Sequence, residues 1–255
     1  MMKRIEKALD AATRILLEHA PNPGPVAYKR ADDPVTEADR AVDAAVRGIL
    51  LREGEGWLSE ETVDDRTRLD KRRVWIVDPL DGTKEFIQGL PEWAVSIGLV
   101  EDHAVLAGGV ANPATSERFT GVRGGPVLRN GEPVTASCRE ALCGATVLAS
   151  RTELRKGQWD GLQHLGMNIV PKGSIAYKLA LLAAGCADLV ISLAPKNEWD
   201  IAAGVLLAEV AGAQVLGLDG RPLRFNQRET LLDGLVAGPP KLVARALEAV
   251  AAATR

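Results

Sequence analysis

The sequence lacks a strong net charge and a long apolar run, and each absence excludes a class of protein. The formal net charge of −3 gives no reason to expect a nucleic acid polymer as a partner. No stretch contains the roughly 18 uninterrupted apolar residues of a membrane-spanning helix, and the first residues lack the apolar segment of a secretion signal. We therefore expect a cytoplasmic protein with no membrane partner.

Cysteine is also scarce. Cys138, Cys143 and Cys186 are odd in number and form no Cys-x-x-Cys pair, which argues against a disulfide framework and a zinc site. We expect reduced, buried thiols. The remaining composition, 25% charged and 46% hydrophobic over 255 residues, is that of a folded chain with a substantial core in one large unit or two smaller ones.

Apolar patterning predicts the elements of the first half. One helical face of residues 1–20 is apolar, and a second amphipathic helix begins near Thr36. Residues 57–59 form a short predicted strand that ends in two acids. The continuous apolar run 74–77 predicts a strand buried on both faces. Alternation and turns from residue 93 to about 122 predict an antiparallel meander.

A polar segment at 130–133 suggests a boundary between two units, residues 1–134 and 135–255. Beyond it, strands and helices alternate, with strands at 146–149 and 189–192 and helices at about 175–184 and 200–211. That order is typical of an α/β arrangement. The expected fold class is therefore α/β, with an α+β first half and an α/β second half.

Acidic residues recur where strands end and helices begin. Carboxylates gathered at such points cannot all stay ionised near one another without cations, and Mg²⁺ is a hard ion that prefers oxygen ligands. The residues in question are Asp33 with Asp39, Glu60 with Glu61, Asp78 with Asp81, and Asp200. Their pattern predicts a Mg²⁺ site.

The run from Asp78 to Thr83 is the most informative segment. The predicted strand ends abruptly at Asp78, and Pro79 stiffens the exit so that Asp78 and Asp81 point toward one pocket. Gly82 and Thr83 then open a helix, whose unpaired N–H groups would hold a phosphate. The alternative is a plain Asp-Gly turn, which would leave the other acids unexplained.

Structural alternatives exist for the other acids as well. Glu60 and Glu61 could form a solvated turn. Asp200 could cap a helix, a role compatible with metal ligation by the same side chain. Thr36 and Asp39 have capping-box spacing, which would give Asp39 a purely structural role.

Four blocks, in this order, resemble the inositol monophosphatase-like superfamily of Mg²⁺-dependent, Li⁺-sensitive phosphatases. The resemblance covers nearly the whole chain and implies an αβαβα layered sandwich. The four blocks are residues 33–39, 59–61, 78–83 and 199–204.

The resemblance also implies a metal site with two or three Mg²⁺ ions. Asp33, or its neighbour Asp32, would lie near a weaker third ion. The residues that match the metal ligands are Glu60, Asp78, the Leu80 carbonyl, Asp81 and Asp200. Such a site agrees with two-metal hydrolysis, in which ions about 3.5–4 Å apart activate a water and stabilise the leaving oxygen.

Catalytic roles follow from the same resemblance. Thr83, paired with Asp39, would orient the attacking water beside Glu60, and the amides of Gly82 and Thr83 would hold the phosphate. No covalent phosphoenzyme is needed. This water-orienting pair argues against a non-catalytic binding protein with the same fold. A scaffold whose acids are merely solvated would not place them after strand ends.

Substrate residues separate two branches of the superfamily. The continuation 84–87 after Gly-Thr and the position of Lys29 resemble the 3′(2′),5′-bisphosphate nucleotidases. The segment containing Ser174 and Lys178 resembles their nucleotide-contacting block, with its lysine displaced by one residue and Tyr177 at the usual place. These residues predict contacts to a nucleotide.

Inositol phosphatases typically place a glutamate about seven residues before the Trp-Asp aspartate, but residues 192–194 contain no acid here. Without that partner, a site discriminates poorly for a polyol. We therefore favour a Mg²⁺-dependent 3′(2′),5′-bisphosphate nucleotidase that hydrolyses 3′-phosphoadenosine 5′-phosphate to AMP and phosphate. The alternative is an inositol-1-monophosphatase or a related sugar-phosphate phosphatase. The partner is a small phosphorylated substrate, and the oligomeric state stays open, a homodimer being one alternative.

Overall fold

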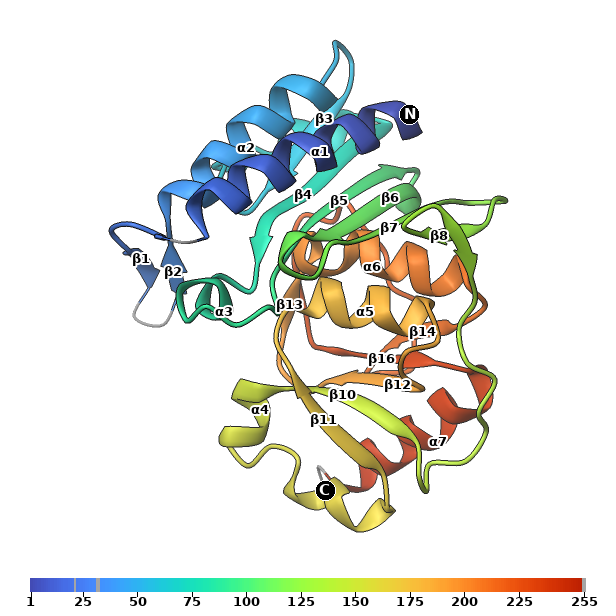
Figure 1. The fold of residues 1–255 in the computed structure, drawn as a ribbon. Helices are drawn as coiled ribbons and strands as arrows, with labels where there is room; N and C mark the ends of the chain where they lie inside the picture. The colour runs from blue at the N-terminus through green and yellow to red at the C-terminus, as the bar shows by residue number, and fades with distance from the viewer. Residues whose placement is uncertain (21, 31–32, 254–255) are drawn as a thin grey trace.

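The computed structural model describes residues 1–20, 22–30 and 33–253, and the side chains of residues 29, 30 and 33 also lie outside this description. The described residues form alternating layers of helix and sheet (Figure 1). Helices α1 (Met2–His19) and α2 (Glu37–Leu50) cover the first sheet. Helices α5 (Ile175–Ala183) and α6 (Glu198–Val210) lie between the two sheets, and α7 (Pro240–Ala253) covers the second. This order confirms the αβαβα layered sandwich.

The outer helices α1 and α2 form where the apolar periodicity predicts them. Each buries one stripe of side chains against the first sheet, as amphipathic surface helices do. In α1 the stripe includes Leu9 and Leu16, and in α2 it includes Val42 and Val46. Thr36 is the N-cap of α2, which agrees with the predicted start of that helix.

The first sheet has the order β3-β4-β5-β6-β7-β8-β9 within the described residues. Its strands are β3 (Gly56–Ser59), β4 (Arg73–Asp81), β5 (Ala94–Glu101), β6 (Ala104–Asn112), β7 (Glu117–Val122), β8 (Val127–Arg129) and β9 (Glu132–Val134). β3 and β4 are parallel, and the later neighbours are antiparallel, which confirms the predicted meander. The polar segment near 130 is the turn between β8 and β9, where Asn130 and Gly131 have positive φ. The division into units 1–134 and 135–255 stays a prediction.

The middle helices lie unusually close to their neighbours because small residues face them. A Cβ added at Gly108 of β6 would lie 3.2 Å from the Cα of Ala203 in α6. A Cβ at Gly204 would lie 2.6 Å from the Cβ of Leu179 in α5, which no real side chain tolerates. Glycine therefore allows α6 to pack closely against both the sheet and α5.

The second sheet has the order β11-β10-β12-β16-β14 in the described part of the chain. Its strands are β10 (Thr146–Ser150), β11 (Asn168–Lys172), β12 (Leu189–Ser192), β14 (Gln214–Gly217) and β16 (Leu235–Gly238). β10 is parallel to β11 and β12, and β16 is antiparallel to its two neighbours. The carboxyl ends of the parallel strands therefore lie along one edge, where α4 (Arg151–Arg155) and α5 begin.

The smaller elements connect these layers. They are the strands β1 (Ala27–Arg30), β2 (Asp33–Val35), β13 (Lys196–Asn197) and β15 (Leu231–Leu232), the helix α3 (Thr83–Ile87), and the 3₁₀ helices η1 (Thr67–Asp70), η2 (Pro113–Thr115) and η3 (Asp160–Leu165). Within the described ranges, no helix combines the length and the apolarity needed to cross a bilayer.

Three expectations from the sequence are wrong in detail. The strand predicted to end at Asp78 continues as β4 to Asp81, because the backbone resumes its pairing with β5 after an irregularity. Helix α6 begins at Glu198 with Asn197 as its N-cap, so Asp200 lies in the first turn rather than at the cap. The cysteine thiols are free but exposed rather than buried, since all three residues lie in segments outside the packed layers.

Candidate active site

The end of β4 forms the floor of the site through a β-bulge. Asp78 pairs with Ser96 and Asp81 with Ala94, so one extra residue is inserted between the two aspartates. Residues three apart in a regular strand point to opposite faces, and the extra residue returns both carboxylates to one side. The Leu80 N–H donates to the Asp78 carboxylate at 2.9 Å, which holds the bulge in place.

Asp78 meets two acids from other elements. Carboxylate oxygens of Glu60, Asp78 and Asp200 all lie within 4.8 Å of one another. Burial raises the pKa of Asp78 well above its usual range, and the neighbouring Glu60 and Asp81 raise it further. Burial, with Asp81 and Glu60 nearby, also raises the pKa of Asp200. A bound divalent cation would relieve this repulsion, and the all-oxygen donor set fits Mg²⁺ better than a thiolate- or imidazole-seeking metal.

Asp200 reaches the cluster from the first turn of α6. The Asn197 N–H donates to one Asp200 oxygen at 2.9 Å, completing a capping box. Capping therefore fixes the side chain that the sequence predicts as a metal ligand, and it does not exclude that role.

Asp81 is held by the second half of the chain. One of its oxygens accepts hydrogen bonds from the Ser174 hydroxyl and the Ala176 N–H, both at 2.7 Å, at the start of α5. Burial raises the pKa of Asp81, while these two donors oppose the shift. The end of β4 is thus attached to α5 as well as to the acid cluster.

Thr83 and Asp39 form the predicted pair. The Thr83 hydroxyl donates toward the Asp39 carboxylate at 3.2 Å and also lies 3.0 Å from the Leu80 carbonyl. The other Asp39 oxygen accepts from the N–H and the hydroxyl of Thr36 at 2.7 and 2.6 Å. Asp39 therefore caps α2 and contacts Thr83 at the same time. With its proton directed at these acceptors, the Thr83 oxygen keeps lone pairs that can accept a hydrogen bond from a water.

A cleft of about 540 Å³ joins the acids to a group of lysines. Its lining contains the predicted site residues Glu60, Asp78, Leu80, Asp81, Gly82, Thr83, Ser174, Lys178 and Asp200. The same cleft is lined by Lys84, Lys156, Lys172 and Lys196, and by Glu85 and Glu153. Lys29 and Asp33, the predicted substrate and third-metal residues, have side chains outside the described part of the structure.

Lys178 is the most buried of these lysines, with 2% of its surface exposed. Burial lowers its pKa to about 8, and the nearby Glu153 carboxylate opposes the shift. Lys196 lies 3.8 Å from the same carboxylate. The lining of the cleft therefore combines carboxylates that suit cations with lysines that suit an anion.

Glu153 is a site residue that sequence reasoning missed. The absence of an acid near 192–194 is true only along the chain, because α4 places the Glu153 carboxylate there in space. It accepts hydrogen bonds from the Ser192 hydroxyl at 3.0 Å, from the Leu193 and Ala194 N–H groups at 3.2 Å, and from the Trp159 ring N–H at 3.2 Å. The signal in the sequence is its position just after strand β10, beside the end of β12.

A second missed contact joins the two halves beside the cleft. The Arg151 guanidinium binds both oxygens of Glu92, at 2.8 and 2.6 Å. Glu92 also accepts the Gly173 N–H at 2.8 Å, next to Ser174. This bidentate pair fixes the loop that leads into α5.

Comparisons with known proteins show the family of this chain. The sequence model of the Inositol monophosphatase family matches residues 1–255. The chain is 31% identical to the probable inositol 1-monophosphatase ImpA of Mycobacterium tuberculosis, over 97% of this chain and 93% of that protein. It is 33% identical to the 3′(2′),5′-bisphosphate nucleotidase CysQ of Escherichia coli, over 83% of this chain and 87% of that protein. The crystal structure of the extragenic suppressor protein suhB from Bartonella henselae matches with a TM-score of 0.84 at 27% identity, over 98% and 97% of the two chains.

The chain belongs to the inositol monophosphatase family, as the sequence predicts. It is a phosphatase that hydrolyses phosphoric monoesters of small molecules. Relatives from both branches stand at 31% and 33% identity, so the choice of substrate depends on the cleft itself.

Proposed function

We propose that this protein is a Mg²⁺-dependent 3′(2′),5′-bisphosphate nucleotidase that converts 3′-phosphoadenosine 5′-phosphate and water to AMP and phosphate. The observation that carries the proposal is the mixed lining of the cleft, which contains the acid cluster and also the lysines Lys178 and Lys196. A bisphosphate has two anionic groups, one for the cations that the acids would hold and one for the lysines. An inositol monophosphate has one.

The proposed Mg²⁺ ligands in the cleft are Glu60, Asp78, Asp81, Asp200 and the Leu80 carbonyl. Bound Mg²⁺ would activate water and neutralise charge that develops on the phosphate and the leaving oxygen. Thr83 accepts a hydrogen bond from that water while its own proton is directed at Asp39. Glu60 would accept a second hydrogen bond from the water. The backbone at Gly82 and Thr83 would hold the phosphate oxygens.

The buried surroundings of Lys178 favour the binding of an anion beside it. Its burial destabilises the ammonium form, so a phosphate beside it would restore that form and bind strongly. Ser174, at the start of α5, donates its hydroxyl proton to Asp81 and lines the same cleft as Lys178. Lys196 adds a second cation to that lining.

Glu153 bears on the choice against an inositol phosphatase. Both of its oxygens already accept two hydrogen bonds each from the protein. A carboxylate so occupied offers little to the hydroxyls of a polyol, which need free acceptors. Inositol-1-monophosphatase remains the second candidate because of the likeness to ImpA.

The experiment compares a bisphosphate nucleotide with the same nucleotide lacking its 5′-phosphate and with two phosphorylated polyols or sugars. Phosphate release is measured with 3′-phosphoadenosine 5′-phosphate, 3′-AMP, inositol 1-phosphate and fructose 1,6-bisphosphate at saturating Mg²⁺. We expect 3′-phosphoadenosine 5′-phosphate to have the highest kcat/KM. Inositol 1-phosphate winning by tenfold or more would refute the assignment.

A variant tests the role of Lys178 directly. Lys178→Met keeps an unbranched side chain, one atom shorter, and removes the charge. We expect its KM for 3′-phosphoadenosine 5′-phosphate to rise about tenfold or more, the value of a hydrogen bond to a charged group. KM for 3′-AMP should stay within twofold, and the exposed Lys71→Met is the matched control.

A further inference from the structure

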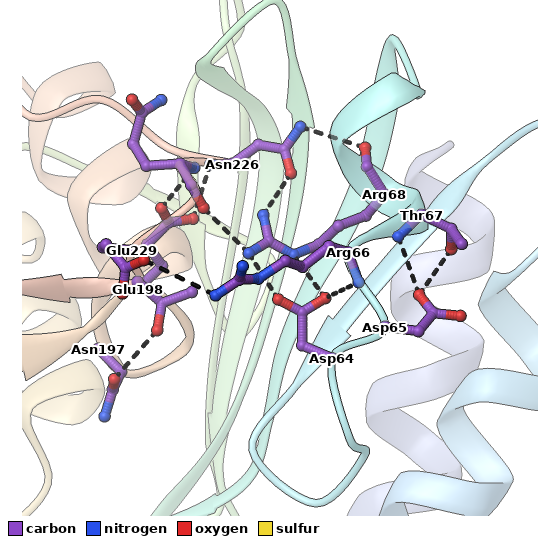
Figure 2. Close-up of polar contacts among 11 residues, drawn as sticks. Asp64, Asp65, Arg66, Thr67, Arg68, Asn197, Glu198, Asn226 and Glu229 are labelled. Atoms are coloured by element: carbon purple, nitrogen blue, oxygen red, sulfur yellow. Dashed lines mark hydrogen bonds and ion pairs between the residues drawn. The ribbon is translucent and has the colours of Figure 1, made fainter.

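A buried polar network joins the two halves of the chain (Figure 2). Its centre is Arg68 in η1, the 3₁₀ helix between β3 and β4. The side chain is 1% exposed and donates to both oxygens of Asp64, at 3.1 and 2.9 Å. It also donates to the Asn226 side-chain oxygen at 2.7 Å and to the Gln227 carbonyl at 3.0 Å.

Asn226 and Gln227 connect Arg68 to the first residue of α6 through hydrogen bonds. The N–H groups of Asn226 and Gln227 donate to the two oxygens of Glu198 at 2.6 and 2.8 Å. Glu198 is completely buried and is the first residue of α6, two positions before Asp200. Asn226 has a φ of 58°, a left-handed conformation that asparagine tolerates better than most residues.

The loop that contains Asn226 also forms hydrogen bonds with Asn197, the N-cap residue of α6, and with Glu198. The Glu198 N–H donates to the Thr230 carbonyl at 2.9 Å, and the Thr230 hydroxyl donates to the Asn197 side chain at 3.3 Å. Asn197 is the residue whose N–H binds Asp200. The loop from 225 to 230 therefore has Arg68 on one side and the first turn of α6 on the other.

The acid cluster needs its three carboxylates to be held close together although they repel one another. Glu60 follows β3 and Asp78 lies within β4, and a parallel ladder holds these two strands together, whereas Asp200 comes from a helix far along the chain. Three carboxylates within 4.8 Å repel one another whenever no cation lies between them. A rigid link between the β3–β4 connection and α6 would keep Asp200 from moving away from Glu60.

We propose that Arg68, Asn226 and Glu198 are positioning residues that hold Asp200 opposite Glu60 and thereby set the affinity of the site for Mg²⁺. The inference rests on the metal site of the proposed function. Arg68, Asn226 and Glu198 are not among the described residues that line the cleft. We therefore infer that these three residues act through the metal ligands rather than on the substrate.

The test measures Mg²⁺ binding directly by isothermal titration calorimetry, with kcat and KM determined alongside. Asn226→Gly keeps the left-handed backbone and removes the side-chain partner of Arg68. Arg68→Lys keeps the charge but removes the planar fork. The control is Glu229→Gln, because Glu229 forms an exposed 3.7 Å pair with Arg66 that joins the same two segments.

We expect the Mg²⁺ dissociation constant to rise about tenfold in both network variants, the lower end of the effect of outer-shell partners on metal sites. At saturating Mg²⁺, kcat and KM should stay within twofold of wild type, and the control should bind Mg²⁺ like wild type. A lowered melting temperature with unchanged Mg²⁺ affinity would overturn the proposal, because that is the result of a merely structural role. Loss of the fold in both variants, judged by circular dichroism, would overturn it too. If wild type itself bound no Mg²⁺, the proposed function would fail first.

Discussion

The carboxylate of Glu153 allows a stability prediction whose size can be worked out from its contacts. The side chain is 2% exposed, and its four hydrogen bonds come from Ser192, Leu193, Ala194 and Trp159. Glu153→Gln keeps the shape but replaces one oxygen with an NH₂ group that cannot accept. Two of the four donors then face a donor.

The better of the two amide orientations places the NH₂ toward Ser192 and Ala194. The Ser192 hydroxyl can turn toward the Ala194 carbonyl, 3.2 Å away, and accept from the amide. The Ala194 N–H is still left without an acceptor, at a cost of about 1–3 kcal/mol. The bonds from Leu193 and Trp159 weaken because the charge is gone. We therefore expect a loss of about 3 kcal/mol, which corresponds to roughly 6–12 °C in melting temperature for a chain of this size.

The assay is thermal unfolding followed by circular dichroism, with kinetics on the folded variant. Without the Glu153 carboxylate the pKa of the buried Lys178 should fall further, so KM for the bisphosphate at pH 8 should rise together with the loss of stability. Glu140→Gln is the control, because its pair with Lys241 is 60% and 69% exposed and should contribute little. A Glu153→Gln variant that melts within 2 °C of wild type would show that these hydrogen bonds do not hold residues 192–194 in place.

Three further predictions concern the acids and the lysine. Asp81→Asn should abolish Mg²⁺-dependent phosphate release while circular dichroism shows an intact fold; retention of most activity would remove Asp81 from the metal site. Because burial lowers the pKa of Lys178 to about 8, its ammonium form is lost as pH rises through 8, so KM for the bisphosphate should climb above that pH while KM for 3′-AMP does not. The folded-state pKa values of Asp78 and Asp200 are raised, so without cations their contribution to stability is present at low pH and is lost as pH rises through those values. Mg²⁺ should therefore raise the melting temperature more at pH 8 than at pH 5, and an equal rise at both would contradict the clustering of these acids.

Much of the fold follows from local pattern. Helices α1 and α2 each carry one clear apolar stripe, and the capping residue Thr36 marks where the second begins. The meander is readable because its turns contain polar residues and its strands are apolar. Local free-energy preferences and tertiary packing agree in these elements, so patterning predicts them.

The site is predictable only in part, for a geometric reason. Acids that follow strand ends can be found along the chain, and Glu60, Asp78 and Asp200 do meet in space. Glu153 and the pair of Arg151 with Glu92 could not be found in this way. Their partners are distant in sequence. The parallel order of β10 and β12 brings Glu153 to residues 192–194, and Arg151 reaches Glu92 in the first half of the chain.

The β4 bulge and the exposed cysteines show a second limit. A one-residue irregularity in strand pairing leaves no mark in composition or periodicity, although it decides on which side Asp81 lies. Cysteine is usually buried, but Cys138, Cys143 and Cys186 lie in connecting segments where average preference carries no information.

The helix layer shared by the two sheets has a consequence for synthesis of the chain. By residue 134 the growing chain already contains Glu60, Asp78 and Asp81, whereas Asp200 and the start of α5 are made later. A cation that meets the unfinished chain would find an incomplete set of oxygens and bind weakly, because metal affinity depends on a preformed site. Tight occupancy of the proposed metal site would then begin only when α6 packs between the sheets, so that a bound ion would mark a completed fold.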